Sequence, residues 1–381
     1  MRQKLTELCD ILYGFAFDSA GFTEDSTYPP LVRIRDVKRG YSETNYSGDY
    51  QEQYVIHAGD LLIGMDGEFN IARWKSRDAL LNQRVCKISA KEGTEEEYLR
   101  FALSRALREI ENRTAFVTVK HLSAKELNKL ELQVPSLSEQ NRIAITLRRI
   151  EQLIDLRNEE LKKLDELIRA RFVEMFGDLA DPACKWEKCR LVDACSNSDD
   201  IKCGPFGTQL GKDEYTEEGV SVWEIPQINS EFKTLPTHFV TEEKAAALNA
   251  YSIIPGDIAM SRKGNVGRCA VFPATFENGI IHSDVLRIRL DKAKVLPEFM
   301  MRQLHYSGDI QHQIELVSSG AIMAGINVTK LKQIYVYLPP IDLQGKFVEF
   351  IAQVDKSKAV IQKSLEEAQL LFDSLMQQYF G

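Results

Sequence analysis

The chain has 381 residues, of which 44% are hydrophobic and 27% are charged, and its formal net charge is −8 at pH 7. The length predicts about two domains with connecting elements, and no apolar run reaches the roughly 18 residues that a membrane-spanning helix needs. The start of the chain lacks a signal-peptide pattern and the seven cysteines are odd in number, so we expect a cytoplasmic protein with reduced thiols and no membrane contact.

Residues 1–136 are predicted to form a first globular segment that carries local basic clusters. Arg33, Arg35, Lys38 and Arg39 lie close together with one opposing acid. A second cluster, Arg73–Lys75, places a tryptophan between two cations. Affinity for phosphates depends on such local clusters more than on whole-chain charge, so the acidic balance does not exclude a nucleic-acid partner. A solvated surface patch is the alternative interpretation of each cluster.

A long helix is predicted over residues 137–177. Its apolar residues recur at alternating steps of four and three, which is the spacing of a heptad seam. The seam residues of this helix are Ile143, Leu147, Ile150, Ile154, Leu161, Leu164 and Ile168. The seam is interrupted once, at Arg157.

Residues 178–340 are predicted to form a second globular segment that repeats the first. Gly59–Gly67 corresponds to Gly256–Gly264, and Leu81–Ile88 corresponds to Ile281–Ile288. A third pair matches only in pattern, Val119–Ser123 with Ile326–Lys330. The frameworks agree while the polar loop tips differ, so we expect two similar scaffolds that read different things. Basic side chains also cluster in the second segment, at Arg262, Lys263 and Arg268.

Four cysteines fall near the start of this second segment: Cys184, Cys189, Cys195 and Cys203. A zinc site is one interpretation. However, no Cys-x-x-Cys knuckle and no histidine accompanies them. We therefore favour small buried thiols and expect no metal site.

A second long helix is predicted over residues 341–381, because Pro135–Gly177 recurs as Pro339–Gly381, 204 residues later and without insertion. Its seam residues are Phe347, Ile351, Val354, Ile361, Leu365 and Phe372. Two helices of equal length with matching seams predict an antiparallel coiled coil, which at about 1.5 Å per residue would be about 57 Å long. The alternative is that each helix packs separately on its own domain.

Catalytic motifs are missing from the sequence. We find neither an Asn-Pro-Pro-Tyr nor an Asp-Pro-Pro-Tyr segment, and no phosphate-binding Gly-x-x-x-x-Gly-Lys-Ser/Thr loop. Glu242–Lys244 has the Glu-x-Lys form of some nucleases but lies in a polar, alanine-rich stretch that reads as a solvated helix face. We therefore expect a non-catalytic protein.

Several segments together resemble the specificity (S) subunit of Type I restriction-modification systems. They are Gly59–Asn70, Leu81–Cys86, Val119–Leu122, and the turns at Pro135 and Pro339 with the helix that follows each. The chain departs from the commoner motif in having Ser136 after the first proline and Leu343 before Gln344, where a glutamate is usual. The resemblance covers essentially the whole chain.

This resemblance implies an α+β fold in which two similar α/β target-recognition domains are joined by two long helices forming an antiparallel coiled coil, as a pseudo-two-fold, circular repeat. The expected domains are residues 1–136 and 178–340, with spacer helices at 137–177 and 341–381. Each domain would read half of a bipartite double-stranded DNA site, and the helices would set the spacer and dock two methyltransferase (M) subunits, which restriction (R) subunits join. The chain itself would hold no cofactor, because S-adenosylmethionine, ATP and Mg would be bound by the partner subunits. The alternatives are a specificity subunit of an ATP-independent system and a protein-interaction scaffold that does not bind DNA.

Under this resemblance, particular loop residues are expected to contact DNA. Phosphate contacts are expected from Arg33, Arg35, Lys38, Arg73, Arg262 and Arg268. Base edges would be read by Asn70, Asn82, Gln83, Arg84, Asn265, His282 and Ser283. Further contacts are expected from Asp66, Glu68, Trp74, Lys120, His121 and Lys263. A hydrogen bond that braces a loop is the alternative role for each.

Overall fold

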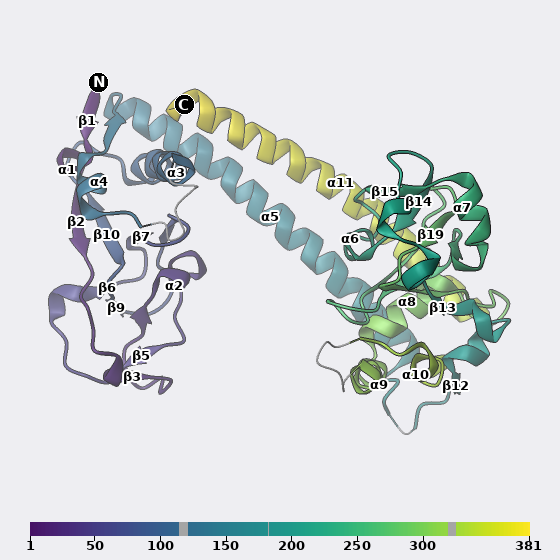
Figure 1. The fold of residues 1–381 in the computed structure, drawn as a ribbon. Helices are drawn as coiled ribbons and strands as arrows, with labels where there is room; N and C mark the ends of the chain where they lie inside the picture. Colours follow the sequence, from purple (N-terminus) through teal and green to yellow (C-terminus); the bar gives the residue numbers. More distant parts are fainter. Residues whose placement is uncertain (114–120, 182, 319–324) are drawn as a thin grey trace. The chain divides into compact units, whose positions relative to one another are not determined.

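The computed structural model describes residues 1–113, 121–181, 183–318 and 325–381 (Figure 1). The chain forms two compact units. Unit 1 combines Met1–Glu160 with Ile361–Gly381, and unit 2 comprises Leu161–Val360. Among the described residues, no helix combines the length and the apolar character that crossing a bilayer requires.

Unit 1 contains short strands and helices around its sheets. The strands are β1 (Arg2–Lys4), β2 (Cys9–Tyr13), β3 (Phe22–Thr23), β4 (Leu31–Val32), β5 (Asn45–Tyr46), β6 (Val55–Ile56), β7 (Leu61–Gly64), β8 (Ile71–Arg73), β9 (Ala79–Leu81), β10 (Val85–Ala90) and β11 (Glu131–Gln133). The helices are α1 (Leu5–Leu8), α2 (Ile34–Arg39), α3 (Glu96–Arg113) and α4 (Ala124–Lys129). One sheet has the order β2-β10-β7-β8 and is antiparallel, and a second has the order β4-β9-β6, with β4 parallel to β9. The pairs β1-β11 and β3-β5 complete the unit.

Unit 2 repeats this topology. Its strands are β12 (Glu187–Arg190), β13 (Ile201–Cys203), β14 (Val220–Trp223), β15 (His238–Val240), β16 (Ser252–Ile253), β17 (Ile258–Ser261), β18 (Cys269–Val271), β19 (Gly279–Ile281), β20 (Val285–Ile288) and β21 (Tyr335–Leu338). Its helices are α6 (Ile225–Asn229), α7 (Glu242–Ala247), α8 (Pro297–Tyr306), α9 (Gly308–Ser318) and α10 (Val328–Leu331). The sheets follow the orders β13-β20-β17-β18, β15-β14-β19-β16 and β12-β21, with β14 parallel to β19. The orders β2-β10-β7-β8, β4-β9-β6 and β1-β11 of unit 1 are thus reproduced, with β15 added at one edge, whereas the pair β3-β5 has no counterpart among the described strands of unit 2.

The apolar runs that recur in the sequence are central strands with a core on each face. In β7, Leu61 and Ile63 point into one hydrophobic cluster and Leu62 into another. In β17, Ile258 and Met260 share one cluster and Ala259 lies in a second. A strand that is covered on both faces needs apolar residues at successive positions, which explains why these segments lack alternation.

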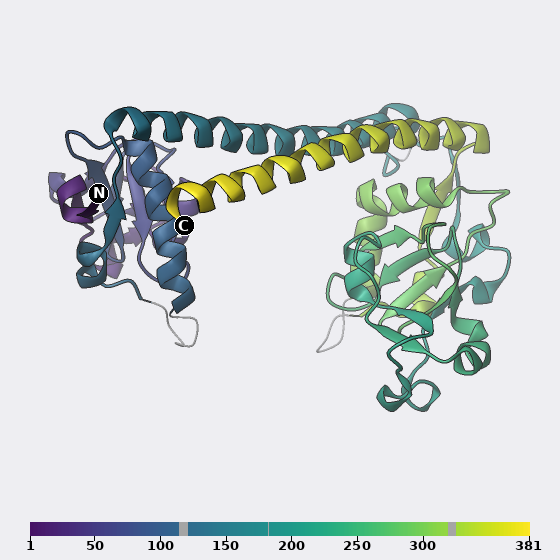
Figure 2. The same ribbon diagram turned by 90° about the horizontal axis from the view of Figure 1, so that it is seen from above.

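Two 40-residue helices, α5 (Leu137–Phe176) and α11 (Ile341–Phe380), run through both units. In unit 1 the start of α5 and the end of α11 lie beside α3 (Figure 2) and share a core with it. The rings of Phe101 and Phe372 are 6.0 Å apart in this core. In unit 2 the end of α5 meets the start of α11, where Phe172 and Phe347 are 5.6 Å apart. The two helices therefore pair in opposite directions, which confirms the predicted antiparallel arrangement.

The predicted seam residues all lie on the shielded side of these helices. Those that are buried are Ile143, Leu147, Ile168, Phe347, Ile351 and Val354. Those that are half-buried are Ile150, Ile154, Leu161, Leu164, Ile361, Leu365 and Phe372. Lys358, which interrupts the second seam, pairs with Asp165 of α5 at 2.7 Å.

A buried glutamine fixes the start of each long helix. The amide nitrogen Nε2 of Gln140 donates to the carbonyl of Pro135 at 3.1 Å, and its Oε1 accepts from the backbone N–H of Glu95 at 2.9 Å. Gln344 does the same with Pro339 at 2.7 Å and Leu296 at 2.9 Å. The role of the glutamine is thus the same in both copies, although the residue before Gln344 departs from the usual motif.

Candidate nucleic-acid interface

Backbone hydrogen bonds gather the predicted loop segments into the same frame in both units. In unit 1 the N–H of Met65 donates to the carbonyl of Arg84 at 2.8 Å, and that of Leu122 donates to Met65 at 2.7 Å. In unit 2 the corresponding bonds run from Arg262 to Asp284 at 2.9 Å and from Ile326 to Arg262 at 3.1 Å. Three segments that are distant in sequence therefore meet at one place in each unit.

This frame corrects one predicted correspondence. The sequence pattern paired Val119 with Ile326, but the hydrogen bonds make Leu122 the equivalent of Ile326. The helix caps agree, because Ser123 caps α4 and Asn327 caps α10. The prediction was wrong by three residues, since an isolated apolar position cannot fix a register that the cap and the frame determine.

In unit 1, three predicted contact residues form one polar cluster. The Nη1 atom of Arg84 lies 2.9 Å from Nδ1 of His121 and 3.3 Å from Oδ1 of Asp66, and His121 pairs with Asp66. Arg84 adopts a positive φ of 69°, which is uncommon for a residue with a side chain. Arg84 and His121 remain about half exposed, so the cluster presents nitrogen donors at the surface.

In unit 2, the equivalent loops carry cations that are paired with acids. Lys263 lies 2.7 Å from Asp284, and Arg268 lies 3.0 Å from Glu231. The Nε atom of Arg262 donates to the carbonyl of Ile326 at 3.0 Å, and its guanidinium lies 4.9 Å from the ring centre of Phe206. These acids hold the basic side chains in place beside the exposed Asn265.

The carboxyl ends of two parallel strands form a second part of each site. In unit 1, β4 is followed by Arg33 and β9 by Asn82. A glycine allows close approach there, because a Cβ on Gly14 would lie 2.0 Å from the carbonyl oxygen of Asn82. Gly204 has the same role beside His282, at 2.3 Å. Our sequence comparison missed these two glycines, although each follows a strand at a matching place in its segment.

The remaining predicted residues of these loops lie at or near the surface. Arg33, Arg35 and Lys38 are exposed along α2, with Lys38 3.7 Å from Glu68. Those that are exposed or half-buried in the other loops are Asn70, Gln83, His282 and Ser283. Lys120 lies outside the described residues.

The predicted DNA contact at Trp74 is wrong. This side chain is 1% exposed within a hydrophobic cluster of unit 1, and its Nε1 donates to the carbonyl of Arg77 at 2.7 Å. Asn82 is also buried, at 7% exposure, and its Oδ1 accepts from the N–H of Gln83 at 2.9 Å. Asn82 therefore braces its loop, and its reading of a base edge stays a prediction.

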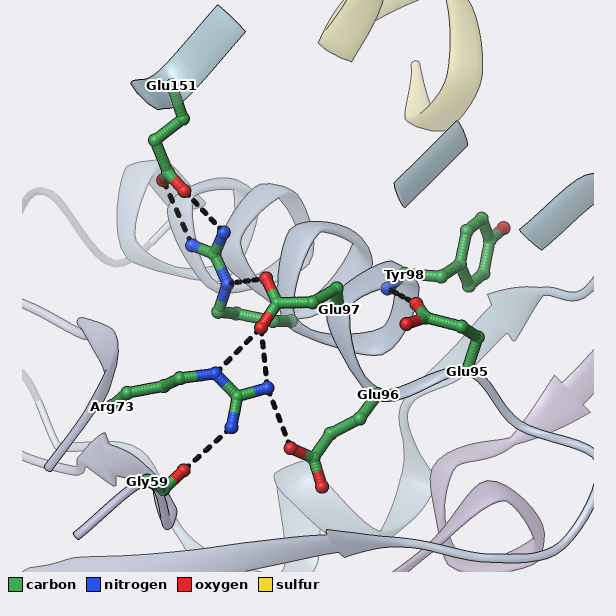
Figure 3. Close-up of polar contacts among 8 residues, drawn as sticks. Gly59, Arg73, Glu95, Glu96, Glu97, Tyr98 and Glu151 are labelled. Atoms are coloured by element: carbon green, nitrogen blue, oxygen red, sulfur yellow. Dashed lines mark hydrogen bonds and ion pairs between the residues drawn. The ribbon is translucent and has the colours of Figure 1, made fainter. Parts of the chain in front are cut away.

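Arg73 belongs to a network of ion pairs and hydrogen bonds within unit 1 (Figure 3). Its nitrogens donate to Glu97 at 2.7 Å, to Glu96 at 2.7 Å and to the carbonyl of Gly59 at 2.6 Å. Glu97 also binds Arg100, which holds Glu151 of α5 through bonds of 3.0 and 2.6 Å. Each nitrogen of Arg73 is thus engaged within unit 1 while the side chain is 33% exposed, and the phosphate contact at Arg73 stays a prediction.

The four clustered cysteines are free thiols. Burial raises the pKa of Cys195 to about 12 and that of Cys189 to about 11. In the part of the chain that the structure describes, no group of three or more His, Cys, Asp or Glu side chains is arranged to hold a metal ion.

Comparisons with known proteins give consistent results. The model of the family described as "Type I restriction modification DNA specificity domain" matches residues 1–166 and 185–370. The chain is 27% identical to the Type I restriction enzyme EcoBI specificity subunit of Escherichia coli, over 99% of this chain and 84% of that protein. It is 19% identical to the MjaVIII specificity subunit of Methanocaldococcus jannaschii, over 89% and 85% of the two chains.

Two solved structures resemble the fold over its full length. The S subunit of a Type-I restriction-modification system from M. genitalium matches with a TM-score of 0.60 and 16% identity, over 100% of this chain and 96% of that one. A chain from a structure concerned with complex assembly and conformational transition of the type I R-M system matches with a TM-score of 0.54 and 20% identity, over 100% and 97%.

Proposed function

The chain belongs to the family of Type I restriction modification DNA specificity domains, and from this premise we propose that it recognises a bipartite sequence in double-stranded DNA, with unit 1 reading one half and unit 2 the other. The observation that carries the proposal is the duplicated loop frame. The same backbone bonds hold Met65 and Arg262 in place, yet the side chains around them differ in charge and shape. Two loop frames with the same backbone bonds and different side chains are suited to recognise two different half-sequences.

We further propose that this chain supplies recognition and that its partners supply chemistry. Two methyltransferase (M) subunits would bind S-adenosylmethionine, and restriction (R) subunits would use ATP and Mg. The complex would act in the cytoplasm. The absence of recognisable catalytic motifs in the sequence supports this division.

The long helices would set the spacer between the half-sequences and dock the M subunits. Apolar side chains on the outer faces of α5 and α11 support the docking role, because the solvent-facing side of a helix usually carries polar residues. The most exposed of these are Leu156, Val360 and Leu370, at 56%, 71% and 72%. Continuous helices of 40 residues each are suited to hold a fixed span.

Binding to duplex DNA at increasing salt tests the proposal. Release of counterions from several phosphates makes log K fall steeply with log salt, by about 0.9 per phosphate contact. A protein-interaction scaffold would show almost no slope with random duplex. Methylome sequencing of cells that express the chain with its neighbouring subunits would then give the bipartite site, and the absence of any such site would contradict the proposal.

The two halves can be separated by mutation. We expect Arg262→Ala with Lys263→Ala to weaken binding to the half-sequence read by unit 2 at least about tenfold, because each contributes a cation to the second loop frame. The preference at the other half-sequence should stay unchanged. Equal loss at both halves, measured with duplexes altered in one half at a time, would show that the units do not read separately.

A further inference from the structure

We propose that Glu224 is a specificity-determining residue of unit 2, which accepts a hydrogen bond from the exocyclic amino group of a cytosine or adenine. This inference rests on the proposed function. Neither Glu224 nor its neighbour His238 stands out in the sequence. The structure places Glu224 and His282 at the carboxyl ends of the parallel strands β14 and β19, and His238 of β15 contacts Glu224.

The strand register shows that Glu224 takes the place that Arg33 has in unit 1. Val32 pairs with Leu81 in unit 1, and Trp223 pairs with Ile281 in unit 2. The residue after each first strand is therefore equivalent, and it is a cation in one unit and an anion in the other. Both begin a short helix, α2 and α6.

The carboxylate of Glu224 has a histidine on either side, and His238 is within hydrogen-bond distance. Its Oε2 lies 2.7 Å from Nδ1 of His238, and its Oε1 lies 3.9 Å from Nε2 of His282. The Nδ1 of His282 accepts from the backbone N–H of Asp284 at 3.2 Å, so the ring hydrogen of a neutral His282 is on Nε2, toward Glu224. The ring of Tyr215 stacks on His238 with centroids 4.7 Å apart.

The side chain of Glu224 also remains partly accessible. The Glu224 side chain is 20% exposed, and those of His238 and His282 are 45% and 26% exposed. An acceptor that is held in place by His238 and partly exposed at the surface is preorganised for a hydrogen-bond donor. Glu224 can therefore brace its loop through His238 and contact a base at the same time.

The chemistry selects the class of base. An ionised carboxylate only accepts hydrogen bonds, and in the major groove only cytosine N4 and adenine N6 donate them. Guanine and thymine present acceptors at those positions, which a carboxylate repels. In unit 1, the equivalent residue is Arg33, which the sequence led us to expect at a phosphate. Its exposed guanidinium would donate to a base edge instead, which suits guanine. The charge reversal between equivalent positions thus gives the two units opposite preferences.

The test uses the full-length chain with its methyltransferase subunits and duplexes selected from a random library. After the half-sequence of unit 2 is known, each cytosine is replaced by 2-pyrimidinone and each adenine by purine, which removes one amino group at a time. We expect one such duplex to bind the wild-type complex about tenfold or more weakly. With Glu224→Leu the same replacement should have little effect, because the apolar side chain offers no acceptor to the amino group.

Two control variants distinguish a loss of folding from a loss of base recognition. Glu243→Gln, an exposed glutamate on α7, should leave every preference unchanged. His238→Asn should weaken binding to the correct half-sequence without changing which base is preferred, since it only positions Glu224. If Glu224→Leu keeps the wild-type response at every position of that half-sequence, the inference is overturned while the proposed function stands. If the wild-type complex selects no sequence at all, both fail.

Discussion

His305, on α8 of unit 2, is held neutral by its surroundings. Burial, followed by the charges of Arg268 and Arg302, lowers the pKa of His305 to about 4. Its Nε2 accepts a hydrogen bond from the backbone N–H of Cys269 at 3.2 Å, at the strand that follows the loop of Arg268. Protonation would break this bond, so a single residue links acidity to the integrity of the second loop frame.

We predict that His305 makes unit 2 less stable in acid. Between about pH 6.5 and pH 4 the unfolded chain takes up a proton that the folded chain refuses, so the free energy of unfolding falls as the pH falls. From pH 7 to pH 5 the loss should be about 2 kcal/mol, from 1.36 kcal/mol per pKa unit. Urea unfolding at the two pH values should show that His305→Gln flattens this loss. His312→Gln, at an exposed position, should keep the wild-type slope.

The buried glutamines give a second prediction. Gln344→Ala leaves the N–H of Leu296 without its partner in a fully buried site, which should cost about 1–3 kcal/mol of unfolding free energy. Gln353→Ala, at an exposed position on the same helix, should cost less than about 0.5 kcal/mol. Equal losses in chemical denaturation would mean that Gln344 does not secure the start of α11.

Single residues were the hardest to predict from the sequence. Arg73 and Trp74 form a basic-aromatic cluster on paper, but a strand alternates its sides and turns the indole into the core while Glu96 and Glu97 capture the guanidinium. Those glutamates follow some twenty residues later, and no local sequence pattern predicts that they pair with Arg73. Glu224 was missed for the same reason, because only the pairing of β14 with β19 brings it beside His282.

At the scale of elements, periodicity was more informative. A seam of apolar residues at steps of three and four specifies which face of a helix is shielded, and the residues predicted for α5 and α11 lie on that face. The central strands β7 and β17 were recognisable as matched apolar runs. The register of the weaker match near Leu122 was not, because residues of the loop before it carry no repeated pattern.

The seam leads to a prediction about α5. Leu147→Ala removes a side chain that is 0% exposed in the core of unit 1, which should cost about 2–5 kcal/mol. Leu156→Ala, at 56% exposure on the same helix, should change the stability by less than about 0.5 kcal/mol. Thermal and urea unfolding would distinguish the two variants. An equal loss of stability in both would mean that the packed face of α5 was assigned wrongly.

At the scale of the whole molecule, the circular repeat was legible in the sequence because both long helices have the same length and endings. The two globular segments could be matched to each other by their recurring segments. The boundary between the compact units could not be predicted, since it falls inside uninterrupted helices at Glu160 and Val360. A helical pattern has no break at such a point. Our assignment of domains at 136, 177 and 340 stays a prediction.

The spacer role is tested at this scale. Deleting seven residues, two turns that preserve the seam, from the middle of both α5 and α11 should change the number of base pairs tolerated between the half-sequences and leave the half-sequences themselves unchanged. Duplex libraries that vary only the spacer would measure this. An unchanged optimal spacer would mean that the helices do not set the distance.

The composition of unit 1 has a consequence for how the protein is made. Residues 361–381 pack against Ile143, Leu147 and α3, yet some 200 residues of chain separate them from those partners. As translation proceeds from the N-terminus, unit 2 has all its own residues before the ribosome adds the last segment of unit 1. The first-made half of the molecule is therefore the last to be completed, and until then it leaves apolar surface open to chaperones or to a neighbouring copy.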